Sequence, residues 1–218
     1  MEVYLPKKLR GSWHFESNKY GYDYQTSPYP EILSDLKVLL TILIEEKLLI
    51  PKFLEGRSEK LNYSSVDDLI EQIQRDDFLQ NCFEFGITGD TVIYTQQGEE
   101  TYSGIFCIES FRTFQQSFVL STKSDIWLPM SFDEDQFSFV WNLERYNLNY
   151  NRLTSALKKV VDATGWENEN LLVKELHERG SLQIGYDLFL SKEVCIKEFG
   201  ENPNYSFNLK EYIIKIDS

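Results

Sequence analysis

Short apolar segments separated by turn-forming pairs occupy the middle of the chain. Strands joined by such tight turns are typical of an antiparallel meander. We therefore expect an antiparallel sheet at the centre of the fold. Its predicted strands span residues 82–87, 91–95, 102–109, 117–122 and 125–128, with breaks at Gly89-Asp90, Gln97-Gly98 and Lys123-Ser124.

Helical spacing of apolar residues occurs on both sides of this segment. Residues 31–50, between Pro30 and Pro51, and residues 151–165 each repeat apolar side chains at intervals of three and four, which predicts amphipathic helices. A further helix should begin at Ser65, whose hydroxyl can cap its first turn, with Asp68 completing a capping-box pattern. We expect an α+β fold in which helices pack on the antiparallel meander sheet, with residues 1–218 forming a single domain.

The remaining elements are read from shorter patterns. Aromatic residues predict a hairpin of residues 13–16 and 20–24, and alternation predicts strands over residues 182–190 and 209–216. Residues 168–179 predict a helix, with strand as the alternative for its Leu171-Leu172-Val173 segment. Apolar residues on both faces of 102–108 predict a central strand that is covered on both sides.

The charge balance narrows the classes of partner. The chain carries 22 basic and 35 acidic residues, so its formal net charge is 22 − 35 = −13. Nucleic acid and anionic membrane surfaces are disfavoured as partners because both are recognised through basic side chains. An acidic balance suits either a basic protein partner or solubility alone.

The chain is expected to be cytoplasmic. Its first residues lack the apolar segment of a secretory signal, and the most apolar stretch, residues 38–44, is too short to span a bilayer. The three cysteines are odd in number and show no paired spacing, so we interpret them as reduced thiols: Cys82, Cys107 and Cys195.

No catalytic, metal-binding or cofactor-binding motif is found. The two histidines, His14 and His177, do not form the paired spacing of a zinc protease, and no Gly-x-Ser-x-Gly elbow or phosphate-binding loop occurs. Acidic runs such as Asp133-Glu134-Asp135 are typical of solvated loops. We therefore predict no catalytic residue, no metal site and no cofactor.

Two segments carry a resemblance to a known class of protein. Residues 121–129, read as Ser-Thr-Lys-Ser-Asp-Ile-Trp-Leu-Pro, are followed by Asn149-Tyr150-Asn151-Arg152-Leu153 and a helix ending at Gly165-Trp166. Together they resemble small acidic bacterial proteins of the immunity type, which accompany polymorphic toxins and block them by binding. The resemblance implies a cytosolic protein whose partner is a toxin domain, often a basic nuclease.

These observations favour a non-enzymatic acidic interaction protein, interpreted as a toxin-neutralising immunity protein that binds a basic toxin domain directly. The candidate partner-binding residues are Asp133, Glu134 and Asp135, together with Glu99 and Glu100. Two alternatives remain. One is a hydrolase with a carboxylate-based site, which needs two converging acids, one of them buried. The other is a small-molecule-binding module with an aromatic pocket.

Overall fold

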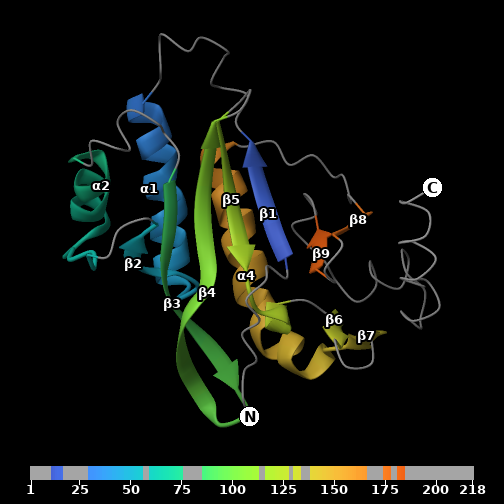
Figure 1. The fold of residues 1–218 in the computed structure, drawn as a ribbon. Helices are drawn as coiled ribbons and strands as arrows, with labels where there is room; N and C mark the ends of the chain where they lie inside the picture. The colour runs from blue at the N-terminus through green and yellow to red at the C-terminus, as the bar shows by residue number, and fades with distance from the viewer. Residues whose placement is uncertain are drawn as a thin grey trace.

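The backbone forms a five-stranded antiparallel sheet with its helices on one face (Figure 1). The computed structural model describes residues 11–16, 29–55, 59–75, 85–112, 116–127, 130–133, 138–165, 174–177 and 181–184. Within these residues the sheet has the order β1-β5-β4-β3-β2. The predicted α+β fold and its meander are confirmed, because β3, β4 and β5 are neighbours both in sequence and in the sheet. The strands are β1 (Gly11–Glu16), β2 (Ile50–Leu54), β3 (Phe85–Thr95), β4 (Gly98–Arg112) and β5 (Gln116–Thr122).

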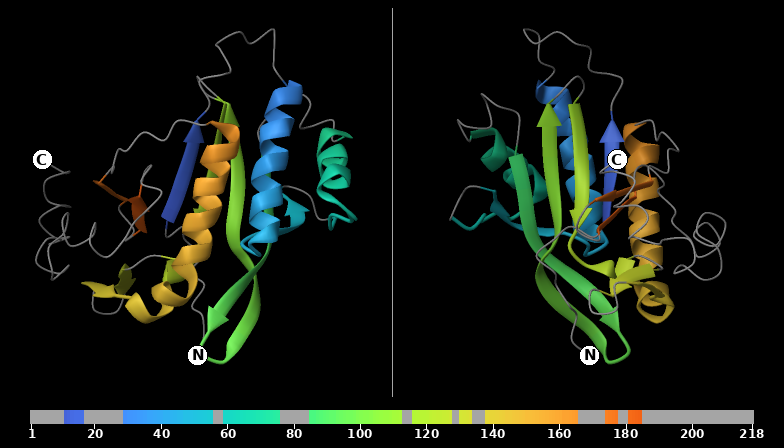
Figure 2. Two further views of the ribbon diagram at one scale, coloured as in Figure 1. Left: turned by 180° about the vertical axis from the view of Figure 1, so that it is seen from behind. Right: turned by 45° about the vertical axis from the view of Figure 1, so that its right-hand side comes forward.

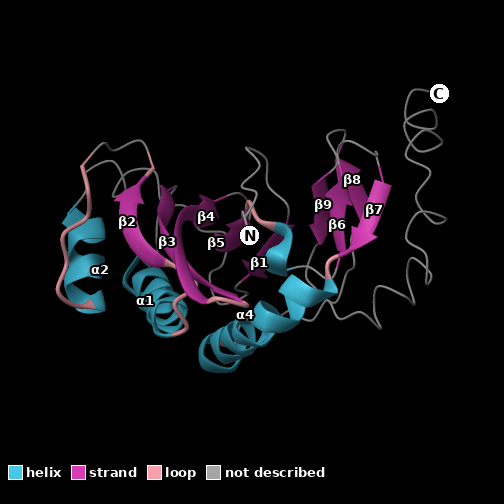
Figure 3. Cartoon of the chain, turned by 90° about the horizontal axis from the view of Figure 1, so that it is seen from below, coloured by secondary structure: helices cyan, strands magenta, loops and turns pink. Residues whose placement is uncertain are grey.

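Two long helices cover one face of this sheet. Helices α1 (Tyr29–Glu45) and α4 (Leu143–Thr164) lie behind the strands in Figure 1 and in front of them when the molecule is turned round in Figure 2. The view from below separates the strands from this helical layer (Figure 3). Helix α2 (Val66–Arg75) packs against α1. The smaller elements are a 3₁₀ turn (Asp125–Trp127) and two hairpins, β6 (Met130–Asp133) with β7 (Ser138–Trp141) and β8 (Lys174–His177) with β9 (Ser181–Ile184).

The main core lies between the sheet and these two helices. Ile87, Ile108 and Leu120 stand side by side in the register of β3, β4 and β5, and all three are fully buried. Burial of each such side chain stabilises the fold by about 1.5–3 kcal/mol. Helix α1 contributes Leu36, Leu39, Leu40 and Leu43 to the same cluster, and α4 contributes Leu153, Ala156, Leu157 and Val160.

A bulge in β4 changes which side chains reach this core. The register passes from Thr88 opposite Cys107 to Asp90 opposite Ser103, so one residue of β3 faces three residues of β4. Gly104, at φ +73°, begins the extra stretch, and a left-handed φ is readily adopted by glycine. Ile105 and the next residue are consequently both fully buried in one core cluster. The bulge explains why two consecutive apolar residues of β4 both reach this core.

Several predicted boundaries in the first half are wrong. The helix predicted for residues 31–50 ends at Glu45, and Lys47 follows with a φ of 54°. Residues 50–54, which begin at the predicted end of this helix, form the edge strand β2. The predicted break at Gly89-Asp90 does not exist, because β3 continues through it. Gly89 is needed for close approach to β2, since a Cβ there would collide with the carbonyl group of Ile50.

Other corrections lie further along the chain. Residues 125–127 form a 3₁₀ turn in place of the predicted strand, and Ser124 Oγ accepts a hydrogen bond from the Ile126 amide. Helix α4 begins at Leu143, eight residues before the predicted start. Residues 174–177, predicted as helix, form a strand because they pair with β9. The predicted strand 182–190 is seen only as far as Ile184, and 209–216 lies outside the described residues.

The N-terminal strand also has a different partner from the one predicted. Residues 13–16 pair with β5, and Trp13 and Phe15 are buried in the core. The predicted partner, residues 20–24, lies outside the described residues. The burial of the two aromatic rings accounts for the position of β1 in the sheet, because each adds a large apolar area to the core.

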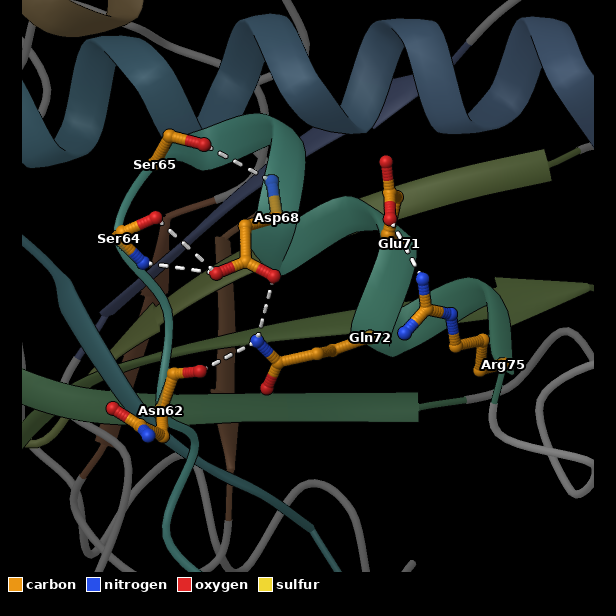
Figure 4. A network of polar contacts seen from close by, with 7 residues as sticks. All are labelled: Asn62, Ser64, Ser65, Asp68, Glu71, Gln72 and Arg75. Carbon is orange, nitrogen blue, oxygen red and sulfur yellow. Dashed lines mark hydrogen bonds and ion pairs between the residues drawn. The ribbon is translucent and has the colours of Figure 1, made fainter.

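The N-terminus of α2 carries the predicted cap in an altered form (Figure 4). Ser65 Oγ accepts a hydrogen bond from the Asp68 amide at 3.1 Å, as expected of a helix cap. The Asp68 carboxylate returns to the Ser64 amide at 3.0 Å, one residue before the partner that a capping box uses. Gln72 Nε2 joins this carboxylate to the Asn62 carbonyl. These hydrogen bonds lower the pKa of Asp68.

Removal of the Ser65 cap should destabilise the protein measurably. We expect Ser65→Ala to lower the free energy of unfolding by about 1 kcal/mol, because the Asp68 amide loses its acceptor. The measurement is urea unfolding followed by circular dichroism. Ser34→Ala is the matched control, since Ser34 is exposed within α1 and alanine favours helix. Equal destabilisation by both changes would contradict the assignment of the cap.

Candidate functional site

Two of the five predicted partner-binding acids lie at the turn between β3 and β4. Glu99 Oε2 forms an ion pair with Lys47 Nζ at 2.9 Å. Glu100 accepts hydrogen bonds from the hydroxyls of Tyr102 and Thr95, and these bonds lower its pKa. Both carboxylates therefore have local partners that hold the end of the hairpin.

The other three predicted acids cannot be placed beside them. Asp133 ends β6 on the backbone, but its side chain is not described, and Glu134 and Asp135 lie outside the described residues. Among the residues that the structure describes, only Glu99 and Glu100 come together, and these are neighbours in sequence. The acidic patch as a whole stays a prediction.

A half-buried arginine joins three elements near the same hairpin. Arg152, on α4, donates from Nη1 to the Glu46 carbonyl just after α1 at 3.1 Å. Its Nη2 donates to the Val92 carbonyl of β3 at 2.7 Å, and the guanidinium carbon lies 4.0 Å from the ring centroid of Tyr94. A planar guanidinium suits this arrangement, because it can donate in several directions while stacking on a ring.

Asn149 completes the attachment one turn earlier in α4. Its Oδ1 accepts from the Tyr94 amide at 2.9 Å, and its Nδ2 donates to the Tyr94 carbonyl at 3.0 Å. It also accepts from Arg152 Nη2 at 3.1 Å. The side-chain amide thus bonds to β3 as a neighbouring strand would. We call Arg152, Asn149 and Tyr94 the α4 clamp.

Burial is the largest influence on the pKa of Arg152 in the α4 clamp. It lowers the pKa of Arg152, while nearby Tyr94, Glu46 and Glu99 oppose the change. The described residues offer Arg152 carbonyl and amide acceptors but no ion pair within 4.0 Å. Arg152 Nε and the indole Nε1 of Trp127 are buried without hydrogen-bond partners among these residues. An arginine in this setting holds elements together and does not exchange protons.

Sequence reasoning did not identify the clamp. Residues 149–152 entered only as part of a resemblance, without a role for any side chain. The available signal was a pair of polar residues three positions apart within an amphipathic helix, on the side that faces the core. Such residues need partners when they are buried.

A second group of polar residues lies on the opposite face of the sheet. In the strand register these residues alternate with the core residues Ile87, Ile108 and Leu120, and no described helix covers them. We call this surface the helix-free face. It comprises the half-buried Thr88 of β3 and the half-buried Cys107 and Glu109 of β4, together with Ser121 and the apolar Val119 of β5, both of which are buried.

Two glutamates lie near each other on this face, Glu55 and Glu109. Gly86 lies opposite Glu109 in the register, and the Glu55 amide donates to the Gly86 carbonyl at 2.7 Å. A Cβ on Gly86 would lie 2.8 Å from Glu55 Cβ and closer still to its carboxylate, so the Glu55 side chain covers the glycine. The Glu55 side chain therefore lies near Glu109, over the backbone of Gly86, which has no side chain of its own.

The electrostatics of Glu109 follow from this arrangement. Burial and then the charge of Glu55 raise the pKa of Glu109, against a hydrogen bond from Ser121 Oγ at 3.3 Å and the charge of Lys123. Neither glutamate forms an ion pair with a described residue. A half-buried carboxylate with a like charge beside it is a feature of binding and catalytic sites, although structural networks produce it too.

The structure describes only one of the cysteine and histidine side chains named in the sequence, that of Cys107. Cys107 is a free, half-buried thiol, and burial raises its pKa to about 12, so it is a poor nucleophile. Cys82 and Cys195 lie outside the described residues, and the side chains of His14 and His177 are not described. No group of three metal-ligating side chains occurs in the part of the chain that the structure describes.

Comparison with known proteins adds no further identification. No protein-family model, curated protein or solved structure matches this chain. Among the described helices, none has both the length and the apolar character needed to cross a membrane. The function must therefore be argued from the residues themselves.

The clamp should be sensitive to the shape of the cation as well as its charge. We expect Arg152→Lys to lower the free energy of unfolding by about 2 kcal/mol or more, because one ammonium group cannot reach the separate acceptors and stack on Tyr94. Arg145→Lys is the control on the same helix, since that side chain is half-buried and donates no side-chain hydrogen bond in the described structure. Chemical unfolding of both variants checks this, and equal stabilities would refute the role of the clamp.

Glu109 should make stability depend on pH. Its pKa is higher in the folded chain, so its contribution to stability is complete below the unfolded pKa of about 4.3 and is lost as pH rises through the folded value. Glu109→Gln should therefore gain stability relative to the wild type as pH rises from about 4.3 toward neutral. Urea unfolding across this range tests the expectation, with Glu59→Gln, at an exposed carboxylate, as the matched charge control. A stability difference that does not change with pH would contradict it.

Proposed function

We propose that this chain is a non-enzymatic binding protein that neutralises a basic toxin domain by direct contact. The observation that carries the proposal is the large surplus of negative charge, −13 over the chain. A surface of this sign attracts a basic partner and speeds its association. It also suits a partner whose own surface is built to meet nucleic-acid phosphates.

The distribution of ion pairs supports this use of the charge. In the described structure five cations are already engaged with internal carboxylates. Because each internal pair is neutral, the surplus lies on acids outside these pairs, which include the exposed Glu45, Glu55, Glu59 and Asp162. The five pairs are Lys37–Asp67, Lys47–Glu99, Lys52–Asp90, Arg75–Glu71 and Lys159–Glu46.

A second candidate function rests on one observation. Glu55 and Glu109 approach each other, and Glu109 has a raised pKa, which is the combination that a carboxylate-based hydrolase requires. The proposed binding function is favoured because Glu109 lies on a sheet face, whereas such hydrolases hold their two acids across a cleft.

The binding proposal is tested with the purified chain as bait in extracts of its native host. We expect a basic protein to be retained at low salt, to elute in a salt step and to lose its toxic activity when the chain is added in equimolar amount. The physical reason is that attraction between opposite charges weakens as salt screens it. Failure to retain any basic protein that is known to be expressed with the chain would overturn the proposal.

The predicted acidic patch is tested with the same partner. Replacing Asp133, Glu134 and Asp135 by their amides should weaken binding and reduce its dependence on salt. A separate Glu99→Gln/Glu100→Gln variant should affect the β3–β4 hairpin first, because both side chains have local partners there. The matched control changes Glu45, Glu59 and Asp162 to amides. Unchanged affinity and salt dependence in the first variant would remove the patch from the binding surface.

A further inference from the structure

The β3–β4 hairpin extends past the end of β5, which leaves part of β4 without a second neighbouring strand (Figure 1). Strands β3 and β4 stay paired as far as Thr95 and Gly98. The pairing of β4 with β5 begins only at Phe106, opposite Thr122. Residues 98–104 of β4 therefore have β3 on one side and, among the described strands, none on the other. We call the outer side of residues 98–104 the β4 edge.

The alternation of an antiparallel pair shows which backbone groups point outward along this edge. Two residues that face each other either exchange both backbone hydrogen bonds or both point away from the partner strand. The backbone groups of Tyr94 and Val92 are bonded to α4 and to the loop after α1, so they point away from β4. Glu99 and Thr101 lie opposite these two residues, and their N–H and C=O groups therefore point away from β3. The same alternation extends to Ser103.

The two edges of the hairpin differ in how their backbone groups are satisfied. The α4 clamp and the Lys47 carbonyl supply partners on the β3 edge. On the β4 edge, Glu99, Thr101 and Ser103 are exposed, and none of them forms a backbone hydrogen bond to a described residue outside the hairpin. A strand edge of this kind is a template for a further strand. Because the clamp holds the hairpin in place, the edge is ordered before such a strand arrives.

The charge beside the β4 edge indicates which kind of strand suits it. The Glu100 carboxylate accepts hydrogen bonds from the hydroxyls of Tyr102 and Thr95 but forms no ion pair with a described residue. Glu144, which is bonded to Gln96 at the end of the hairpin, forms none either. An added strand would place a side chain about 5 Å from Glu100, between the two Cβ atoms. A basic side chain is favoured there, whereas a second copy of this acidic chain would bring like charges together.

We propose that the basic partner docks by adding one of its strands to the β4 edge, with its backbone paired to Glu99, Thr101 and Ser103 and a lysine or arginine side chain beside Glu100. This inference rests on the proposed function, for which it names the contact surface and the mode of recognition. Main-chain hydrogen bonds supply affinity in this mode, and the neighbouring side chains supply specificity. The predicted acidic patch includes Glu99 and Glu100 for their charge alone, whereas here the backbone of β4 makes the principal contact.

Hydrogen exchange of the full chain, followed by NMR at single amides, tests the edge before a partner is identified. The amides of Thr101 and Ser103 should exchange at least about tenfold faster than those of Glu100 and Tyr102, which point to β3. Equal protection of all four amides would show that the edge is already covered, and would overturn the proposal. Protection of Thr101 that rises with protein concentration would do the same, because it would show pairing with a second copy.

The captured partner tests the docking itself. In the complex the amides of Thr101 and Ser103 should become protected, together with a segment of the partner that contains lysine or arginine. Thr101→Pro removes one outward N–H group but no hydrogen bond to β3, and it should weaken binding about tenfold or more. Thr101→Val keeps the amide and should bind as the wild type does.

Two controls make this comparison decisive. Urea unfolding shows whether both variants are folded, and the exchange measurement on the wild-type complex needs no substitution if Thr101→Pro is not. Unchanged exchange of the Thr101 and Ser103 amides in the complex would overturn the docking mode. Equal binding by a folded Thr101→Pro variant would overturn it as well.

The outcomes separate this inference from the proposed function. If the chain neutralises a basic partner and the Thr101 and Ser103 amides stay unprotected, the docking mode is wrong and the proposed function stands. If no basic partner is retained, the proposed function fails, and the peptide Lys-Val-Lys-Val-Lys-Val decides whether the edge accepts a basic strand. This peptide should protect both amides, whereas Lys-Pro-Lys-Pro-Lys-Pro, of equal charge, should not. The same response to both peptides, or to neither, would overturn the inference.

Discussion

The half-buried guanidinium of Arg152 is the constraint on which the position of the β3–β4 hairpin depends. A cation partly removed from water needs hydrogen bonds in the protein, and here Nη1 and Nη2 find them at the carbonyls of Glu46 and Val92 and at the side-chain amide of Asn149. These acceptors belong to the end of α1, to β3 and to α4. These directional contacts favour the observed arrangement of the three elements. Apolar packing alone would tolerate more sliding between helix and sheet.

The two faces of the sheet serve different purposes because the strands alternate. One face gives its apolar residues to the helices, and the bulge at Gly104 adds Ile105 to them. The other face carries mainly polar side chains, of which Glu109 and Cys107 are half-buried and Ser121 is buried. Gly86 belongs to this second face, where the Glu55 side chain covers it. The polar side chains of the helix-free face therefore lie on strands whose opposite face packs in the core.

Acidic residues in this protein divide into two groups with different consequences. Glu99, Glu100 and Asp68 have local partners, so their charges stabilise turns and helix ends. Glu55 and Glu109 have no ion pair in the described structure, and one raises the pKa of the other. The number of acidic residues in a stretch of sequence does not show to which of these two groups an acid belongs. An acid is available to a partner only when the fold leaves it without a cation.

The sequence by itself determined the fold class, the meander and the main helices, because these follow from local apolar spacing and turn residues. Ser65 and Asp68 likewise revealed a helix start, since capping involves residues a few positions apart. The sequence did not reveal β2, the continuity of β3 through Gly89, or the pairing of β1 with β5. Each of these depends on a partner strand that is distant in the chain.

The candidate sites show more clearly which features follow from the sequence and which only from the tertiary structure. The net charge was available from composition, and the prediction of a basic binding partner rests on it. The clamp joins residues 46, 92, 149 and 152, and the carboxylate pair joins residues 55 and 109. Only tertiary structure brings such residues together. The burial that gives Arg152 its role and raises the pKa of Glu109 is a property of the packed chain, so no local pattern records it.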